Sequence, residues 1–442
     1  MSICLQPRTL PTAVALACAL LASAAQATNG MNMEGYGPIS TAMGGASQAF
    51  DHGTAALAQN PATLALMGPG SRTDLAIGLL GPKVASSMAG MPVAKSTGTS
   101  YVMPALGFVR RSGAWIYGIG VFAQGGMGTE YGADTFLAAG SAQPVRSELG
   151  VGRVLLPLVF QVSPDFAVGA TLDLMWAGLD MRMAASGAQL GGLVTGASGA
   201  LGAALPSLGG APWARIDFSN SSDFTGAAKS TGWAGKLGAV YAVSPDLRLG
   251  ASYHFKSSLK DLKTSASGAS LSATGGFVDS GRITVVDFQW PAIGAVGLAW
   301  QASPALQLVA DIKSIAWSGV MQDFRLRYDS AGLGGSVSFS LPQNWKDQTV
   351  LNLGMAYALS ANTTLRAGLN LGDNPIPDAL VHPLFPATEK RHLMLGLGQR
   401  LSSAGELHVS LTVAPTSTVT NGQGVTITHR QTNLQLMYSH RF

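Results

Sequence analysis

Hydrophobic and polar residues alternate along most of the chain beyond its first 70 residues. For example, Leu249 and Tyr253 fall on one face of an extended segment, whereas Ser252 and His254 fall on the opposite face. Alternation with a period of two over about ten residues is typical of strands that separate an apolar surface from a polar one. The pattern therefore predicts an all-β fold.

Short turn sequences join the alternating stretches in pairs. Ser-Pro-Asp and Ser-Ala-Asn favour turns and are too short to be anything but hairpin connections. Turns of this kind lie at Ser163, Ser244, Ser303, Ser360 and Ser402, and a sixth lies at Arg111-Ser112-Gly113. Six hairpins supply twelve strands, and two further strands, near 71–80 and 425–442, bring the prediction to fourteen. An even number places both ends of the chain on the periplasmic side and the longer loops on the outer side.

The first 27 residues have the features of an export signal. Arg8 is the single charge, an apolar stretch follows it, and residues 25–27 form an A-x-A cleavage pattern. We therefore expect a cleaved signal peptide at 1–27. Because both cysteines, Cys4 and Cys18, lie in this segment, the mature protein is expected to contain no disulfide and no cysteine-based metal site.

The composition points to a protein surrounded by lipid. Charged residues make up 11% of the chain and the mean hydropathy is +0.26, whereas soluble domains contain about 25% charged residues. No segment beyond the export signal offers about 20 consecutive apolar residues, which excludes a helical membrane protein. A closed β-barrel is the other fold that satisfies every backbone polar group in a bilayer. The net charge of +4 is too small and too scattered to indicate a nucleic-acid partner.

The segment 28–70 has a different character from the rest of the chain. It is rich in glycine and alanine, and Glu34 and Asp51 are its only acidic residues. Such a segment cannot bury enough apolar surface to form a domain, yet it is too apolar for a solvated tail. Asn60-Pro61 has the preferences of a helix start that leads into Ala62. We expect a hatch of short helices at 28–70, enclosed by a barrel at 71–442.

The same segment resembles the N-terminal hatch of the FadL/TodX family of outer-membrane channels for hydrophobic compounds. The matching residues are Gly35-Tyr36-Gly37, Ala42-Met43-Gly44-Gly45-Ala46, Asp51 and Asn60-Pro61-Ala62, with a further match at Leu365–Leu397. The resemblance covers most of the mature chain and implies a transmembrane antiparallel β-barrel of 14 strands with the helical hatch in its lumen. It also implies that Gly35, Asp51, Asn60, Pro61 and Ala62 hold or gate the hatch.

Glycines are concentrated in the predicted third strand, where they often mark a bulge or a bend. Members of the family have an inward kink in this strand that opens a lateral hole in the wall, and Gly128-Thr129-Glu130-Tyr131 resembles a family segment beside it. The resemblance places the kink at Phe122, Gly125 and Gly126. The alternative is that these glycines only relieve packing against the hatch.

The predicted outer loop from Ala185 to Pro212 contains no charged residue. Its leucines recur near helical spacing, which predicts two short apolar helices outside the membrane. An exposed apolar surface of this kind marks a binding site or a contact with a partner. In the resembled family this loop helps to form an outer groove that captures substrate. The groove residues that follow are Leu190, Leu193, Val194, Leu201 and Leu205. A glycine-rich loop without fixed structure is the alternative.

The strand faces also place charged residues inside the barrel. If the substrate is a fatty acid, a lumen cation should meet its carboxylate, and Lys236, Lys256 and Arg366 are the candidates. The strand faces also place Asp287 and Asp311 inside. Because charges in a barrel lumen usually pair, a salt bridge to Asp287, Asp311 or the hatch is the favoured alternative for each cation. An aromatic hydrocarbon would need no cation.

The sequence contains no serine-hydrolase elbow, phosphate-binding loop or zinc-protease motif, so we expect no enzyme activity, metal or cofactor. We predict a passive, monomeric outer-membrane channel for hydrophobic compounds, with long-chain fatty acids as the expected substrates. They would be captured at the outer groove and released laterally into the bilayer. The last strand, which ends at Phe442, resembles the strand that barrel-assembly machinery recognises. A general porin for polar solutes and a lipase-like barrel enzyme are the alternatives.

Overall fold

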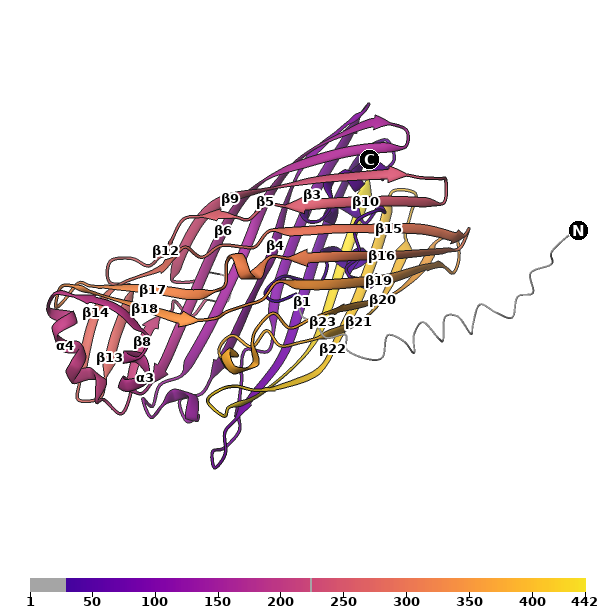
Figure 1. Ribbon diagram of the computed structural model, residues 1–442. Coiled ribbons are helices and arrows are strands. Elements are labelled where there is room, and N and C mark those ends of the chain that lie inside the picture. The colour runs from indigo at the N-terminus through magenta and orange to yellow at the C-terminus, as the bar shows by residue number, and fades with distance from the viewer. Residues whose placement is uncertain (1–28, 223–224) are drawn as a thin grey trace, which may run out of the picture.

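The computed structural model describes residues 29–222 and 225–442, and the expected signal peptide at 1–27 lies outside this range. The described chain forms a closed antiparallel barrel whose wall extends beyond one rim into a smaller group of strands and helices (Figure 1). We call this rim the outer end and the end with the short hairpin turns the inner end.

The long strands form the wall of the barrel. They are β1 (Gly70–Ser87), β3 (Tyr101–Ser112), β4 (Trp115–Tyr131), β5 (Val145–Ser163), β6 (Phe166–Ala185), β9 (Ala228–Ala242), β10 (Leu247–His254), β15 (Ile293–Ser303), β16 (Leu306–Ile315), β19 (Gln348–Ala358), β20 (Thr363–Gly372), β21 (Arg391–Arg400), β22 (Gly405–Thr420) and β23 (Thr426–Arg441). Each hydrogen-bonds to its neighbours in antiparallel register, and β23 closes the barrel by pairing with β1.

Shorter elements lie mainly at the outer end. The short strands are β2 (Ala94–Lys95), β7 (Val194–Ser198), β8 (Ala214–Phe218), β11 (Ser258–Leu259), β12 (Leu262–Lys263), β13 (Ala269–Ala273), β14 (Phe277–Val286), β17 (Asp323–Ser330) and β18 (Ser336–Pro342). The α-helices are α2 (Gly37–Ala42), α3 (Gly187–Gly191) and α4 (Gly199–Gly209), and the 3₁₀ helices are η1 (Gly53–Ala58), η2 (Pro61–Leu66), η3 (Phe136–Ala138), η4 (Trp317–Gly319) and η5 (Asp378–Leu380).

The prediction of fourteen strands is wrong, because the closed circuit of strand pairings runs through 18 strands. The inner part of β6 pairs directly with β9, but its outer part pairs with β8. The circuit then continues through β13, β14 and β12 before it reaches β9. The prediction counted only strands that meet at tight inner turns, and it assigned most of these additional residues to outer loops. Their backbone groups instead pair with one another and prolong the wall.

The predicted faces of β23 are confirmed. In β23, Leu434 and Leu436 are 44% and 42% exposed, whereas Gln435 and Met437 are 6% and 2% exposed. The apolar row therefore faces outward and the alternate row faces the lumen, as expected for a barrel in lipid. The six short turns are also present, for instance where Ser163 of β5 pairs with Phe166 of β6.

The N-terminal helices lie inside the barrel, close to its inner end. Every residue of η1 is buried, and so is nearly all of α2 and η2. α2 packs against β20 to β23 on one side of the lumen, while η1 and η2 pack against β3 to β6 and β9 on the other. This short, glycine-rich segment is stable because the wall surrounds it.

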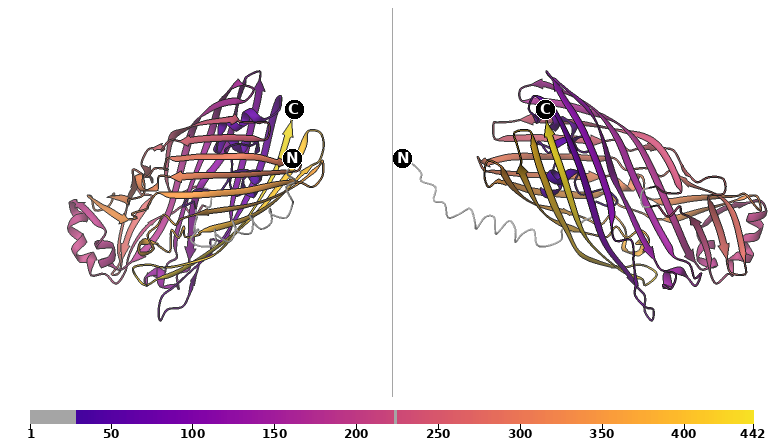
Figure 2. Two further views of the ribbon diagram at one scale, coloured as in Figure 1. Left: turned by 45° about the vertical axis from the view of Figure 1, so that its right-hand side comes forward. Right: turned by 180° about the vertical axis from the view of Figure 1, so that it is seen from behind.

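The outer extension contains the two helices that the apolar loop predicts. α3 and α4 pack on each other at the tip, in the same part of the molecule as β8, β13 and β14 (Figure 1). Figure 2 shows these helices at the tip from two further sides. α4 packs on β18, and β18 pairs with β7. Among the described residues, the structure has no helix that is long and apolar enough to cross a membrane.

Candidate functional site

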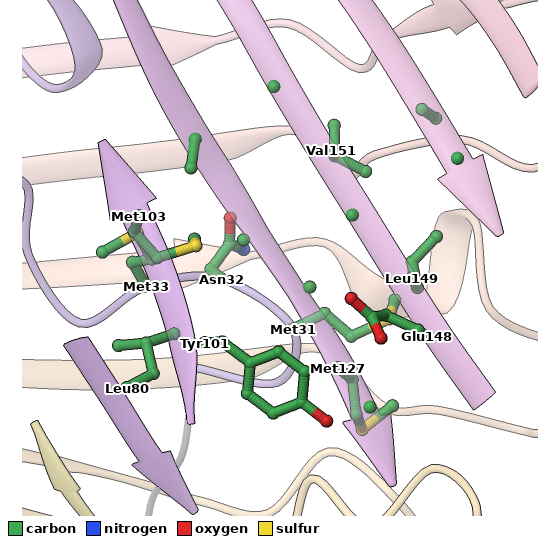
Figure 3. A pocket seen from close by; sticks show the side chains of 18 of the residues that line it. Met31, Asn32, Met33, Leu80, Tyr101, Met103, Met127, Glu148, Leu149 and Val151 are labelled. Carbon is green, nitrogen blue, oxygen red and sulfur yellow. The ribbon is translucent and has the colours of Figure 1, made fainter. Parts of the chain in front are cut away.

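A large cavity lies above the N-terminal helices and reaches the barrel wall. Its volume is about 510 Å³, which is within the range of cavities that bind small molecules. Met31, Met103 and Met127 lie around it beside Tyr101 (Figure 3). Methionine is flexible and polarizable, so this lining can adapt to apolar molecules of different shapes.

The cavity coincides with a gap in the barrel wall. β3 and β4 are paired from their inner turn as far as Leu106 and Val121. Both strands continue toward the outer end, but within the described residues they no longer pair with each other beyond this point. The gap ends at the outer side, where the amide of Thr97 donates a hydrogen bond to the carbonyl of Glu130 over 2.8 Å. The wall therefore has a bounded opening between these two strands.

The lining of the cavity includes side chains from both faces of the wall. Met31 and His392 are buried, at 3% and 2% exposure. Val102, Val121 and Trp176 belong to the outward face and are 39%, 37% and 41% exposed. Because one cavity contacts both sets, it connects the lumen with the surface that faces lipid.

A β-bulge lies next to this opening, among the glycines of β4. β4 shifts its register against β5 between Ala123 and Gly125, which is the signature of a β-bulge. Gly125 forms a bridge to Asn32 of the N-terminal segment, and a Cβ atom at Gly125 would collide with the carbonyl oxygen of Met31. Phe122, just before the bulge, is buried against η1 and η2. Glycine is needed here because two backbones meet.

Three tryptophans support the N-terminal segment from the other side. Trp290, Trp317 and Trp345 are at most 2% exposed and stack edge to face in sequence. The indole nitrogen of Trp290 donates to Asn32 Oδ1 over 2.7 Å, and Gly30 lies directly against Trp317. The residue pattern alone gave no indication of this cluster, because the three positions come from separate loops between strands.

Asn60 connects the N-terminal helices to each other and to the wall. Its side chain accepts a hydrogen bond from the Ala62 amide at 3.1 Å, which caps η2. The same side chain donates to the carbonyl of Gln48 at 2.8 Å and to that of Ala239 on β9 at 3.0 Å. Pro61 occupies the first position of η2, where its missing amide hydrogen is not required.

Asp51 fastens the same helices to β1. Its carboxylate lies 2.9 Å from Arg72 Nη1, and it accepts a hydrogen bond from the Gly53 amide at 3.0 Å. Arg72 also contacts Asp74, which accepts from the Thr54 amide at 2.6 Å. Burial by itself raises the pKa of Asp51, but the Arg72 guanidinium and the Gly53 amide outweigh it and hold the pKa below its usual 3.8. Asp51 is therefore ionised at neutral pH.

Gly35 lies at a close approach of two backbones within the N-terminal segment. A Cβ atom there would stand 2.9 Å from the Cα of Gly45. Gly44 directly precedes Gly45, and its carbonyl accepts hydrogen bonds from Asn352 of β19 and Asn370 of β20. A side chain at Gly35 would separate these contacts.

The three candidate cations do not line the cavity. Lys236 is buried, and its ammonium lies 2.5 Å from Asp173, which also pairs with Arg153. Lys256 is exposed beyond the end of β10. Arg366 lies near an inner turn, with Nη1 3.5 Å from His408 Nδ1. The structure does not bring the three together.

The predicted lumen position of Asp287 is wrong. Its side chain is 63% exposed, and it pairs with Arg325 in the outer extension. Asp311 does lie inside the barrel, where its carboxylate accepts hydrogen bonds from the amides of Ser47 and Gln48. This acid holds the N-terminal segment against β16.

The leucines predicted to line an outer groove pack mainly into the extension itself. Leu190 and Leu201 are 7% and 0% exposed and belong to its core. Leu193, Val194 and Leu205 are partly buried against that core. These side chains therefore hold α3 and α4 onto the sheet.

Comparison with known proteins places the chain in a family. Residues 14–440 match the family described as outer membrane protein transport protein (OMPP1/FadL/TodX). The chain belongs to this family. The family and its solved members indicate an outer-membrane channel for hydrophobic compounds rather than an enzyme.

Several solved structures resemble the whole barrel. The toluene transporter TodX of Pseudomonas putida is 33% identical, with a TM-score of 0.83 and coverage of 93% of this chain and 99% of that chain. The toluene transporter TbuX of Ralstonia pickettii is 32% identical, with a TM-score of 0.78 and coverage of 93% and 99%. The monoaromatic hydrocarbon channel CymD is 26% identical, with a TM-score of 0.74 and coverage of 94% and 99%.

A shorter match was found to an uncharacterised protein of Chlorobium limicola, named for the 5′ region of a phosphoenolpyruvate carboxykinase gene. The two are 47% identical over 74 residues, which are 17% of this chain and 36% of that protein. This chain therefore spans about a third of the length of that relative.

Proposed function

We propose that the protein is a passive channel for small neutral hydrophobic molecules, of which monoaromatic hydrocarbons are the best candidates, and that it releases them sideways through the opening between β3 and β4. The observation that carries the proposal is the single cavity that contacts both lumen-facing and lipid-facing side chains. A molecule in this cavity can leave for the bilayer without crossing the inner end of the barrel.

Desolvation is sufficient to drive binding in such a site. Burying one CH₂ group contributes about 0.8 kcal/mol, so a toluene-sized molecule gains several times that amount from an apolar, methionine-lined cavity. Such a molecule needs no ionic partner. The N-terminal helices at 37–66 act in this proposal as the hatch that closes the lumen below the cavity.

Two observations favour neutral aromatic molecules over the long-chain fatty acids expected from the sequence. The candidate cations Lys236, Lys256 and Arg366 lie away from the cavity, so a substrate carboxylate would not meet them there. TodX, TbuX and CymD, which are between 26% and 33% identical, are described as toluene transporters or a monoaromatic hydrocarbon channel. The proposed outer capture site is the extension that carries α3 and α4, although its leucines are largely buried.

An uptake experiment tests this proposal. Cells that produce the protein and cells with an empty vector would be supplied with radiolabelled toluene or oleate at low concentration. We expect toluene uptake to rise about fivefold or more with the protein, and oleate uptake to change little. Faster oleate uptake with unchanged toluene uptake would reverse the choice of substrate class, and no increase in either would contradict the channel.

A further inference from the structure

The cavity has one polar end, formed by two carboxylates and two imidazoles. Glu389, on the segment that leads into β21, and His392, in β21 itself, line the cavity. His429 of β23 and Glu34 of the N-terminal segment line it as well. Each of the four residues is at least nine-tenths buried, with exposures between 1% and 8%. The proposed function, which needs only an apolar cavity, gives these groups no role.

The four side chains are close enough to form one cluster. His392 Nε2 lies 3.3 Å from Glu34 Oε1 and 3.7 Å from Glu389 Oε2. His429 Nε2 lies 3.5 Å from Glu389 Oε1, and Asn433 donates to Glu34 Oε1 over 3.2 Å. The cluster thus spans β21, β23 and the N-terminal segment. Within the described ranges, no group of histidine, cysteine, aspartate and glutamate side chains is arranged to hold a metal ion.

Several polar atoms of the cluster are left without hydrogen bonds. Within residues 29–222 and 225–442, Glu389 Oε1, His392 Nδ1 and His429 Nε2 are buried and have no hydrogen-bond partner. Buried polar atoms of this kind cost free energy unless another group satisfies them. The His429 ring donates from Nδ1 to the carbonyl of Pro386, so Glu389 Oε1 and His429 Nε2 are both acceptors. A ligand in the cavity with a hydrogen-bond donor would supply the partner that they lack.

The charge of the lining decides which polar group fits. Glu34, Glu148 and Glu389 all line the cavity, whereas Lys229 is the one lysine among its described lining residues and is exposed to solvent. A carboxylate ligand would therefore meet like charges as well as lose its hydration. A hydroxyl group is neutral and donates a hydrogen bond to a carboxylate or to an unprotonated imidazole nitrogen, which a carboxylate ligand cannot do.

We propose that this polar end binds the hydroxyl group of a neutral hydrophobic molecule, such as a phenol or an alcohol, and disfavours the corresponding carboxylate. The inference rests on the proposed function and extends its substrates from plain hydrocarbons to hydroxylated ones, which the polar end is expected to favour. The ring or chain occupies the methionine-lined part, while the hydroxyl donates its hydrogen toward Glu389 Oε1 and His429 Nε2, which lie 3.5 Å apart. The His429 ring already donates from Nδ1 to the carbonyl of Pro386, so its Nε2 is an acceptor.

Calorimetric titration of the purified full-length protein in detergent tests this proposal with three matched probes: toluene, p-cresol and 4-methylbenzoate. The three share one methyl-substituted ring and differ only in the polar substituent. We expect p-cresol to bind about tenfold more tightly than toluene, and 4-methylbenzoate to bind at least about tenfold more weakly than p-cresol. Equal affinities for toluene and p-cresol, or tighter binding of 4-methylbenzoate than of p-cresol, would overturn the inference.

Variants separate the polar end from the rest of the cavity. Glu389→Gln and His429→Leu should each reduce the preference for p-cresol over toluene about fivefold and leave toluene affinity within about twofold of the wild type. Glu406→Gln, at the inner end of the barrel, is the matched control and should leave all three affinities unchanged. An unaltered preference in both cavity variants, with toluene still bound, would also overturn the inference.

The two proposals fail in different ways. If the wild type binds none of the probes, the proposed channel for aromatic molecules fails and the polar site fails with it. If toluene binds and p-cresol shows no advantage, the channel stands and the polar site alone is rejected. The heat-dependent gel mobility of each variant shows whether its barrel has folded, and because Glu389→Gln keeps the size of the side chain, it remains testable if His429→Leu does not fold.

Discussion

The backbone amide of Gly126 in β4 donates a hydrogen bond to the carbonyl oxygen of Met31, with 3.1 Å between nitrogen and oxygen. This bond joins the N-terminal segment to the bulged strand at the place where the wall is open. Asn32 strengthens the junction, since its side chain accepts hydrogen bonds from both Gln124 and Trp290. The segment that begins the hatch therefore also forms one boundary of the lateral opening, so movement of either one must affect the other.

Gly125→Ala tests this junction. A Cβ atom at Gly125 would collide with the Met31 carbonyl, so the N-terminal segment must move away from β4. We expect faster exchange of the amide hydrogens of residues 30–34 by about tenfold, because the local bonds open more often. Exchange mass spectrometry of the purified protein measures this.

Gly150→Ala is the matched control for that experiment. Gly150 also lines the cavity, but a Cβ atom there meets open space. In Gly150→Ala, the amide exchange of residues 30–34 should equal that of the wild type. Unchanged exchange in Gly125→Ala would mean that the segment does not depend on the contact with β4.

The ion pair between Asp51 and Arg72 predicts a pH-dependent hatch. The pKa of Asp51 is lower in the folded protein than its usual 3.8, so the stabilisation is fully present above this value and is lost as the pH falls through the folded pKa. We expect the wild type to be closed to ions at pH 7 in planar bilayers and to show added conductance only below about pH 3.8.

Asp51→Asn removes the charge at every pH. The variant should therefore show raised conductance already at pH 7, because the amide cannot neutralise Arg72. Asp165→Asn, in the turn between β5 and β6, provides a matched control that should behave as the wild type. Steady conductance of the wild type at pH 7 would instead favour an open porin.

His52 makes the pH prediction more specific. Burial lowers its pKa to about 4, so this side chain is neutral at pH 7 and gains a charge in the same acid range. Protonation of His52 and neutralisation of Asp51 both loosen the hatch, and His52→Gln should narrow the pH range of the transition without abolishing it. Conductance recorded between pH 3 and pH 6 measures the pH range over which the hatch opens.

Asn60→Ala should loosen the hatch by a different route. The substitution removes the cap of η2 and the hydrogen bonds to Gln48 and Ala239. Loss of a helix cap costs about 1–2 kcal/mol, which raises the population of a displaced hatch about tenfold. Limited proteolysis of the folded barrel should then cut within residues 53–66 more rapidly than in Asn362→Ala, whose site is an exposed turn. Equal cleavage of the two variants would contradict this role of Asn60.

Much of the fold can be predicted from the sequence because each strand of a barrel wall carries a simple local pattern of alternating residues. Alternation identifies the faces of β10 and β23, and the serine-containing turns identify the inner hairpins. The number of strands could not be obtained in the same way. β8 and β13 are five residues each and pair with distant partners in the outer extension, and such pairing depends on tertiary contacts rather than on local pattern.

The candidate site, like the fold, can be predicted from the sequence only in part. Gly125 is visible in the sequence, since glycine in a strand interior signals a bulge. The polar end of the cavity is not visible, because Glu34, Glu389 and His429 are far apart in the chain and meet only through the register of the closed barrel. The leucines of α3 and α4 show the opposite case: their apolar character is evident, but burial in the extension accounts for it.

The most direct test of lateral release compares toluene uptake by Gly150→Phe with uptake by Gly209→Phe. A side chain has open space at both positions, but Gly150 lines the cavity and Gly209 lies at the end of α4. If molecules leave between β3 and β4, Gly150→Phe should reduce uptake at least about tenfold while Gly209→Phe keeps the wild-type rate. Equal, wild-type uptake by both variants in folded barrels would contradict release through this opening.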